Sequence, residues 1–268
     1  MKEKTFMTPN GEIHYYVDLA GEEKLSLIFL PGLTADHRLF DKQIEYFEGK
    51  ANMLVWDAPA HTASRPFDMN FSLFDKAGWL GEILENEKLQ KLVIIGQSMG
   101  GYVAQVYQEI CPGKLKGFVS IDSAPLQKSY MSKAEIWSLK HTEGMYRMYP
   151  WKLLLKDGSE GCAVSEYGVS LMREMMEPYG SKAYSELAGH GYRILAEAVE
   201  ADLPYEITCP AILICGEEDR AGFTRKYNEK WHLKTGLPLY WVKGAGHNSN
   251  TDRPEEINRL IEDFINTL

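Results

Sequence analysis

Short apolar runs alternate with amphipathic segments along most of this chain, and this alternation constrains its fold more than any other feature. The runs are rich in Val, Ile, Leu or aromatic residues, are bounded by Gly, Pro or Asp, and span residues 25–30, 52–58, 91–96, 116–122, 210–216 and 238–244. Near-continuous apolarity over such a length is typical of strands that are covered on both faces, as in a parallel sheet. Residues 12–20 alternate apolar and polar instead, which predicts a half-exposed strand near the start.

Helical periodicity fills the gaps between several of these runs. Apolar residues recur at steps of three and four in 71–89 and 99–110, and the tail has Pro254 and two acids before a similar pattern. Strands that alternate with helices predict an α/β fold with a doubly wound, mostly parallel sheet.

One long segment breaks the alternation. Residues 126–204 contain no convincing strand and read as several helices that are rich in aromatic residues and methionine. We expect this segment to be an inserted helical cap (lid) on the sheet, with residues 1–125 and 205–268 forming the core. Flexible thioethers and aromatics in a cap suit a tolerant apolar pocket, so we expect an apolar group in the substrate.

The boundary between run 91–96 and the helix at 99–110 carries a G-x-S-x-G motif, Gly96-Gln97-Ser98-Met99-Gly100. In a strand–turn–helix context this motif is typical of a nucleophilic serine. The turn is so tight that side chains at Gly96 and Gly100 would collide with their surroundings, and the serine backbone is strained. The positive end of the next helix lies at the same spot and favours an oxyanion. We therefore predict that Ser98 is a nucleophile.

A serine nucleophile needs a base, and the base needs an acid that orients it. Asp219 and His247 each follow an apolar run, so we expect both on loops at the carboxyl ends of strands, where catalytic groups gather in open α/β sheets. We predict His247 as the base and Asp219 as the acid. Oxyanion donors are expected from the backbone N–H groups of Leu33, in the sharp turn after the first run, and Met99.

On these residues the chain resembles the α/β-hydrolase fold superfamily over nearly its whole length. The matching pieces, in order, are "PGL", "WDAPAHTASRPF", "IGQSMGG", "IDSAP", "CGEEDR" and "GAGHNS", and nucleophile, acid and base follow in the order of that family. The resemblance implies hydrolysis of an ester, amide, thioester or C–C bond without a cofactor, beneath a variable helical lid.

Three departures from the family pattern are informative. Pro31-Gly32 stands where many members have His-Gly, and Ala60 and Thr62 fill positions that are usually glycine, so that loop is expected to be less permissive. Relatives that act as dehalogenases or epoxide hydrolases need an aspartate at position 98, and the serine there argues against both activities.

Other assignments remain open. Glu217 and Glu218 are adjacent to Asp219, and some relatives take the acid from the strand that ends here in Asp122, which we expect instead to cap the loop into the lid. His37 and His61 lie on loops near the predicted site and could line it. None of the six histidines besides His247 has metal-ligand spacing with a partner, so we expect no metal. The resemblance also implies that no cofactor is needed.

Composition narrows the class of partner. The formal net charge of -9 would be repelled by a nucleic acid or an anionic membrane surface, and the four cysteines form no C-x-x-C pair. No apolar run approaches the length of a membrane span, and "MKEKTFMTPN" lacks the apolar stretch of a secretory signal. We expect a cytoplasmic protein that acts on a small molecule; no pattern specifies its oligomeric state.

The sequence thus predicts a serine hydrolase, above all a carboxylesterase of small to medium esters. One alternative is a C–C hydrolase of a dienoate-type ketone, for which Arg147, Arg173 or Arg193 could bind the substrate carboxylate. Another is a ligand-sensing module on the same fold, which would turn over negligibly.

Overall fold

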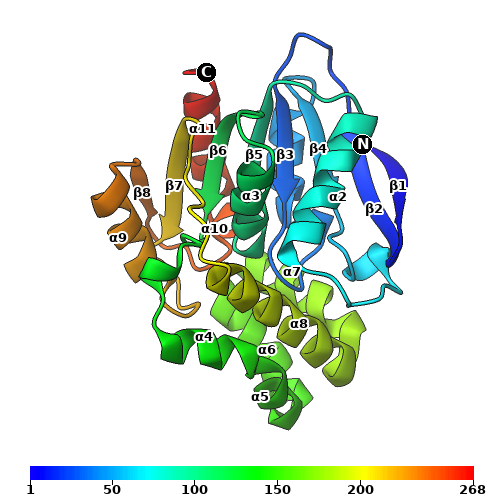
Figure 1. Cartoon of the computed structure of the whole chain (residues 1–268), viewed down its shortest axis with the longest axis vertical. Helices are drawn as coiled ribbons and strands as arrows, with labels where there is room; N and C mark the ends of the chain where they lie inside the picture. The colour runs from blue at the N-terminus through cyan, green and yellow to red at the C-terminus, as the bar shows by residue number, and fades with distance from the viewer.

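A computed structural model describes all residues 1–268, and its centre is one eight-stranded sheet with the order β1-β2-β4-β3-β5-β6-β7-β8 (Figure 1). The strands are β1 (Lys2–Thr8), β2 (Gly11–Asp18), β3 (Ser26–Leu30), β4 (Asn52–Trp56), β5 (Leu92–Gln97), β6 (Leu115–Ile121), β7 (Ala211–Gly216) and β8 (Leu239–Val242). The first two strands pair antiparallel with their neighbours, and all later pairs are parallel. The predicted mostly parallel, doubly wound sheet is confirmed.

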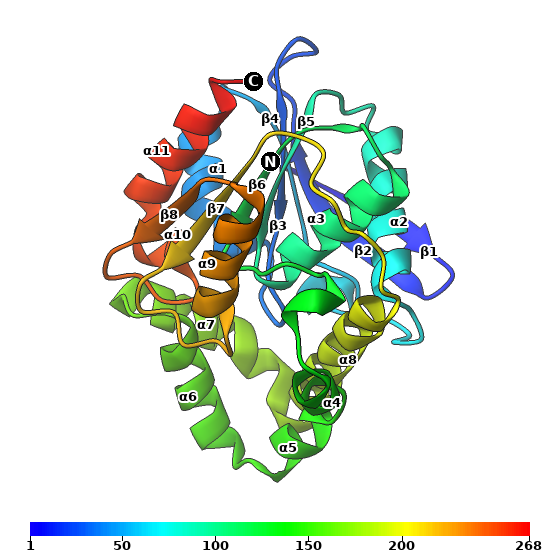
Figure 2. The same ribbon diagram turned by 60° about the vertical axis from the view of Figure 1, so that its left-hand side comes forward.

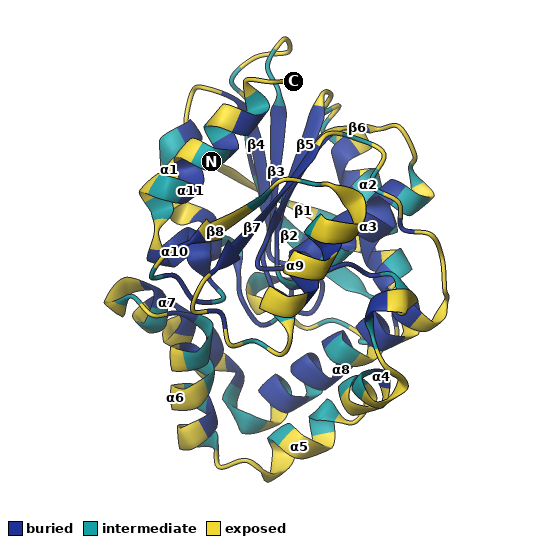
Figure 3. Cartoon of the chain, turned by 90° about the vertical axis from the view of Figure 1, so that its left-hand side faces the viewer, coloured by how far each residue is buried: buried dark blue, intermediate teal, exposed yellow.

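The central strands are largely apolar because helices cover both faces of the sheet. Every residue of β3, β4 and β5 is buried, whereas β2 alternates between buried and half-buried residues as its period-2 pattern predicts. The hairpin partner β1 was not predicted, because its alternation lies among charged residues at the edge of the sheet. Figure 3 shows buried residues in the strands and exposed ones on the outside of the molecule.

Helices α2 (Leu73–Asn86) and α3 (Met99–Ile110) lie on one side of the sheet, and α1 (Asp41–Phe47) and α11 (Pro254–Ile265) lie on the other (Figure 2). Short α10 (Ser249–Asp252) precedes α11, and α9 (Thr224–Thr235) packs on β7 and β8. The periodic segments predicted α2, α3 and α11, but α1 and α9 lacked a strong apolar stripe and were missed. None of the helices combines the length and hydrophobicity that crossing a bilayer requires.

Between β6 and β7 the chain forms five helices and no strand, which confirms the helical insertion in this fold. They are α4 (Lys133–Lys140), α5 (Thr142–Met148), α6 (Trp151–Cys162), α7 (Glu166–Met176) and α8 (Gly180–Glu200). These helices gather at the carboxyl ends of the parallel strands (Figures 1 and 2). Buried Met175, Met176 and Leu187 belong to the same hydrophobic cluster as the sheet, so the insertion and the sheet share a core.

Four short 3₁₀ helices complete the chain: η1 (His37–Phe40), η2 (Thr62–Ser64), η3 (Lys128–Tyr130) and η4 (Glu177–Tyr179). The first two follow β3 and β4, so their loops lie at the same edge of the sheet as the helical insertion. This edge is where the predicted site residues converge.

Candidate active site

Ser98 sits on a strained turn between β5 and α3. Its backbone angles are φ 49° and ψ -116°, a region that residues with a side chain rarely occupy. The turn is held by close backbone approaches: a Cβ on Gly100 would lie 1.9 Å from the Leu30 carbonyl oxygen, and one on Gly96 2.5 Å from the Gly101 nitrogen. The two glycines of the motif therefore allow α3 to begin directly against β3 and β5.

A chain of hydrogen bonds joins three residues that lie on loops after different strands. His247 Nε2 lies 2.8 Å from Ser98 Oγ, and His247 Nδ1 lies 2.9 Å from Asp219 Oδ2. Because the Asp219 carboxylate accepts from Nδ1, that nitrogen carries the imidazole proton and Nε2 is free to accept a proton from the serine. Glu217 and Glu218, the neighbours that competed with Asp219, are exposed.

Burial and charge act in opposite directions on His247. Its side chain is 12% exposed, and burial alone would lower its pKa. The charge of Asp219, the hydrogen bond to it and the charge of Asp122 outweigh this effect and raise the pKa of His247 above its usual value. Asp219 is fully buried and its second oxygen accepts from the Ala221 N–H at 2.7 Å, so the acid is fixed in place.

Asp122 lies behind this chain and does not contact His247 by a hydrogen bond. Its Oδ1 accepts from the Gly216 N–H at 2.8 Å, and its Oδ2 accepts from the Ser249 N–H at 2.9 Å. These backbone groups flank the loops of Asp219 and His247, so Asp122 holds the two loops together. The expectation from sequence, that Asp122 caps the loop into the lid, is wrong. Burial and the nearby Asp219 charge hold its pKa well above the usual range.

The loop after β3 approaches the nucleophile at Gly32, where a Cβ would lie 3.2 Å from the Ser98 Cβ. The next residue is Leu33, and neither its N–H nor that of Met99 donates a hydrogen bond within the protein. Met99 is the first residue of α3, so its N–H belongs to the free donors of a helix N-terminus. One unpaired N–H group, that of Met99, therefore follows Ser98 directly in the chain, and a second, that of Leu33, lies one residue after the point where the β3 loop approaches Ser98.

The loop after β4 has the backbone conformation of a glycine-rich loop, although alanine and threonine occupy the glycine positions. Ala60 and Thr62 have φ values of 68° and 31°, both in the left-handed region that glycine favours. Contacts with the insertion hold this conformation, because the Thr62 N–H donates to the Tyr179 hydroxyl at 3.0 Å.

Neither candidate histidine near the site joins the Ser98 chain. His37 Nδ1 bonds Asp57 at 2.8 Å and its ring packs on Tyr16. His61 is 1% exposed, and its Nδ1 lies 2.9 Å from the Pro59 carbonyl. The three arginines considered for a substrate carboxylate, Arg147, Arg173 and Arg193, are all exposed.

Several residues that support the chain were not found from sequence. Gln97 Nε2 donates to the His247 carbonyl at 2.7 Å, and Ser123 Oγ donates to the Ser98 carbonyl at 2.7 Å. Asp252 accepts from Val164, Ser165 and Gly246, and so links the insertion to the His247 loop. The position of Gln97 inside the G-x-S-x-G motif could have indicated its role. No sequence pattern indicated the roles of Ser123 and Asp252.

Carboxylates and other possible metal ligands gather in two places, Asp36 with His37 and Asp57, and Asp122 with Cys215 and Asp219. In both, protein groups already occupy the carboxylates: Asp36 pairs with Arg38 at 2.8 Å, and Asp57 with His37. Both groups are explained as internal hydrogen-bond networks.

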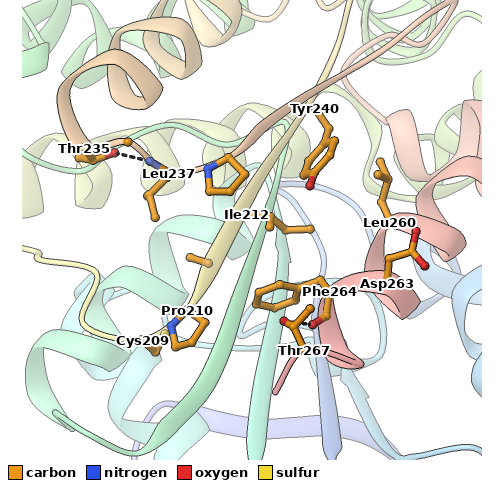
Figure 4. Close-up of a pocket in the computed structure, with 13 residues that line it drawn as sticks. Cys209, Pro210, Ile212, Thr235, Leu237, Tyr240, Leu260, Asp263, Phe264 and Thr267 are labelled. Atoms are coloured by element: carbon orange, nitrogen blue, oxygen red, sulfur yellow. Dashed lines mark hydrogen bonds between the residues drawn. The ribbon is translucent and has the colours of Figure 1, made fainter.

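A cavity of about 580 Å³ lies away from Ser98, at the amino end of β7 (Figure 4). Its walls come from β7, β8 and α11 and include Pro210, Leu237, Tyr240 and Phe264. In a parallel sheet the amino ends of strands are opposite the edge that carries the hydrogen-bonded chain, so this cavity is separate from it.

Comparison with known proteins agrees with this geometry. The sequence model of the Alpha/beta hydrolase family matches residues 27–260. The chain is 22% identical to (E)-2-((N-methylformamido)methylene)succinate hydrolase of Acinetobacter baylyi, over 100% of this chain and 99% of that protein. It is 23% identical to Serine hydrolase BPHL of Mus musculus, over 96% of this chain and 84% of that protein.

Solved structures share the fold at low sequence identity. A thermophilic esterase from Thermogutta terrifontis superposes with a TM-score of 0.78 at 17% identity, covering 100% of this chain and 99% of that one. The enol-lactonase from Burkholderia xenovorans LB400 gives a TM-score of 0.79 at 17% identity, covering 98% of this chain and 100% of that one.

Proposed function

We propose, since this chain belongs to the alpha/beta hydrolase family, that it is a hydrolase that cleaves a carboxylic ester through an acyl-enzyme on Ser98. The observation that carries the proposal is the unbroken hydrogen-bonded chain from Asp219 through His247 to the Ser98 hydroxyl. A serine hydroxyl becomes a strong nucleophile when an oriented imidazole can take its proton as it attacks.

In the proposed reaction Ser98 Oγ attacks the ester carbonyl carbon while His247 Nε2 accepts the hydroxyl proton. The Leu33 and Met99 N–H groups donate to the carbonyl oxygen as it becomes an oxyanion. Collapse of the tetrahedral intermediate breaks the bond to the alkoxide, which leaves with the proton from His247. Water then attacks the acyl-enzyme with His247 as base, and the acid and free Ser98 are released. Asp219 stabilises the imidazolium throughout.

The helical insertion would act as the lid of this site. We assign residues 126–204 to the lid, and residues 1–125 and 205–268 to the hydrolase core. Met172 contacts Asn248, next to His247, at 3.6 Å, and Met175 contacts the Asp36 amide at 3.4 Å. These buried thioethers lie over loops of the site, which supports a substrate with an apolar group.

One alternative keeps the same nucleophile and changes the bond. The relative from Acinetobacter baylyi is named for a methylenesuccinate, which carries two carboxylates. The alternative function is a C–C hydrolase of a dienoate-type ketone, whose substrate would also carry a carboxylate. Turnover of a ring-fission product, compared with a p-nitrophenyl ester series, separates the two reactions.

Fluorophosphonate labelling tests the assignment directly. We expect the label on Ser98, no label in Ser98→Ala, and ester turnover that falls by roughly 10⁴- to 10⁶-fold in that variant. Ser120→Ala, which removes another buried serine hydroxyl, is the matched control and should keep both label and turnover. Ester turnover that persists in a clean Ser98→Ala preparation would refute the proposal, and a burst without steady state would favour a ligand-sensing role.

A further inference from the structure

The Asp252 carboxylate is buried between the lid and the loop of His247, outside the hydrogen-bonded chain of Ser98. Asp252 is the last residue of α10, which lies beside α7 of the lid (Figure 3), and it is 7% exposed. Each hydrogen bond to its side chain comes from a backbone N–H group, and no cationic side chain pairs with it. A buried carboxylate without a cationic partner depends on such donors.

These donors come from two segments that are far apart in the chain. Val164 and Ser165 belong to the connection between α6 and α7 of the lid, residues 162–165, which we call the lid junction. The Ser165 N–H donates to Asp252 Oδ1 at 2.8 Å, and the Val164 N–H lies 3.1 Å from both oxygens. Gly246, the residue before His247, donates to Oδ2 at 2.8 Å. One carboxylate therefore joins the lid junction to the loop of His247.

The residue after His247 is held by the same lid junction. The Asn248 N–H donates to the Cys162 carbonyl at 2.6 Å, and the carbonyl of His247 itself accepts from Gln97 Nε2 at 2.7 Å. Both chain neighbours of His247 are thus bound to the lid junction, one through Asp252 and one directly. The position of the imidazole ring therefore depends on where the lid junction lies.

Close backbone packing at the lid junction leaves little room for adjustment. A Cβ on Gly246 would lie 3.2 Å from the Cys162 carbonyl oxygen, and one on Gly168 of α7 would lie 2.8 Å from Asp252 Oδ1. The backbones of the lid and of the His247 loop therefore contact each other with no side chain between them. A shift of the lid junction would break its hydrogen bonds to Asp252 and to the His247 loop together.

We propose that Asp252 is a positioning residue through which the docked lid junction holds His247 in line with Ser98. The catalytic part of this inference rests on the proposed function. The alignment is demanding, because His247 must stay 2.8 Å from Ser98 Oγ and 2.9 Å from Asp219 Oδ2 at the same time. A misplacement of about 1 Å can cost roughly 10²-fold in rate. The lid that covers the site therefore also completes it, and lifting the lid junction releases the base.

Two variants break this connection from opposite sides. Asp252→Asn keeps the shape of the side chain but replaces one acceptor oxygen with an NH₂ group, which would face backbone N–H donors. Ser165→Pro removes one of those N–H groups from the lid junction, and the φ of Ser165, -76°, is one that proline adopts. Proline also removes the hydroxyl that caps α7, so Ser165→Ala, which loses only that cap, is the reference for Ser165→Pro.

The ring tautomer of His247 is a readout that does not depend on catalysis. Nδ1 carries the proton because it donates to Asp219. Two-bond ¹⁵N–¹H NMR correlations of histidine-labelled protein report the tautomer at a pH where the ring is neutral. We expect Nδ1–H in wild type, and a shift towards Nε2–H in Asp252→Asn and, beyond any change in Ser165→Ala, in Ser165→Pro. A loss of stability alone would lower Tm without changing the tautomer of the folded protein.

Ester kinetics give the second readout. We expect kcat of Asp252→Asn and of Ser165→Pro to fall by about tenfold to a hundredfold with KM nearly unchanged, because alignment and not binding is impaired. The double variant should be little slower than the slower single variant, because both changes break one connection. Ser132→Ala removes the cap of α4, elsewhere in the lid, and is the control: it should lower Tm and keep both kcat and the tautomer.

The two readouts keep this inference and the proposed function apart. If no ester is turned over and Ser98 is not labelled, the proposed function fails, while the tautomer still decides whether Asp252 and the lid junction position His247. The inference is overturned if neither variant changes the tautomer, or if their effects on kcat multiply in the double variant. A tautomer that shifts in Asp252→Asn but not in Ser165→Pro would overturn the part assigned to the lid.

Discussion

Asp122→Asn is expected to destabilise the fold, because asparagine has one side-chain oxygen where aspartate uses two to accept hydrogen bonds. The carboxyl group is fully buried and accepts from the Gly216 and Ser249 N–H groups through separate oxygens. It keeps both acceptors when it is protonated, because a hydroxyl oxygen can also accept a hydrogen bond. An asparagine offers one oxygen, and its NH₂ group would face the second N–H, donor against donor. One backbone N–H is then buried without a partner.

The size of the effect follows from that single lost acceptor. A buried N–H without a partner costs about 1–3 kcal/mol of the free energy of unfolding. In a chain of this size each kcal/mol lowers Tm by about 2–4 °C, so Tm should fall by roughly 2–12 °C. Calorimetry and urea unfolding of wild type and Asp122→Asn measure both quantities.

The pH dependence provides a second, independent reading. Burial and the Asp219 charge raise the pKa of Asp122, so the folded protein keeps this proton at pH values where the unfolded chain has lost it. Folding then takes up a proton, and the stability due to Asp122 falls as pH rises above the unfolded value of about 4. Asparagine does not titrate, so the cost of the substitution should be largest in acid and shrink towards alkaline pH.

Ser120→Ala is the control for Asp122→Asn. Ser120 is buried on β6, two residues before Asp122, and its hydroxyl has no partner, so its removal should be neutral or slightly stabilising. The reasoning would be wrong if Asp122→Asn matched wild type in Tm, or if its cost grew as pH rose.

Three further outcomes can be measured. Gly100→Ala places a Cβ 1.9 Å from the Leu30 carbonyl oxygen and should lose more than about 4 kcal/mol of stability in urea unfolding, whereas Gly78→Ala meets no atom within 4 Å and should gain up to about 1 kcal/mol. The acid limb of kcat/KM should lie above about pH 6.5, because the proposed base His247 has a raised pKa and must be neutral to act; a limb well below that value would contradict the assignment. Lys76→Met should be more stable than wild type at neutral pH, and this difference in stability should shrink as pH rises from about 7 to 10. The folded lysine loses its proton near pH 7, and the unfolded lysine loses it only near pH 10. A stability difference that does not change with pH would contradict the cost of burying the charge.

The missing parts of the prediction from sequence have one physical cause. Apolar steps along α2 predicted one buried face, yet Lys76 and Trp79 are buried too, because α8 covers a second face of that helix. No local pattern reports a covering helix that is supplied by residues a hundred positions later. The same reason hid Asp252, which meets the insertion only after both have folded.

The sequence by itself determined the strands from β2 onwards, the helices α2, α3 and α11, the insertion after β6, and the serine turn. These features are encoded locally, by apolar periodicity and by glycines that allow close backbone approach. Tertiary structure alone decided that Asp219 and not its neighbours meets His247, that Asp122 joins two loops, and that Lys76 is left without a protein partner. Each of these facts depends on the distance between loops or helices far apart in the chain, and that distance is set by how the sheet and its helices pack.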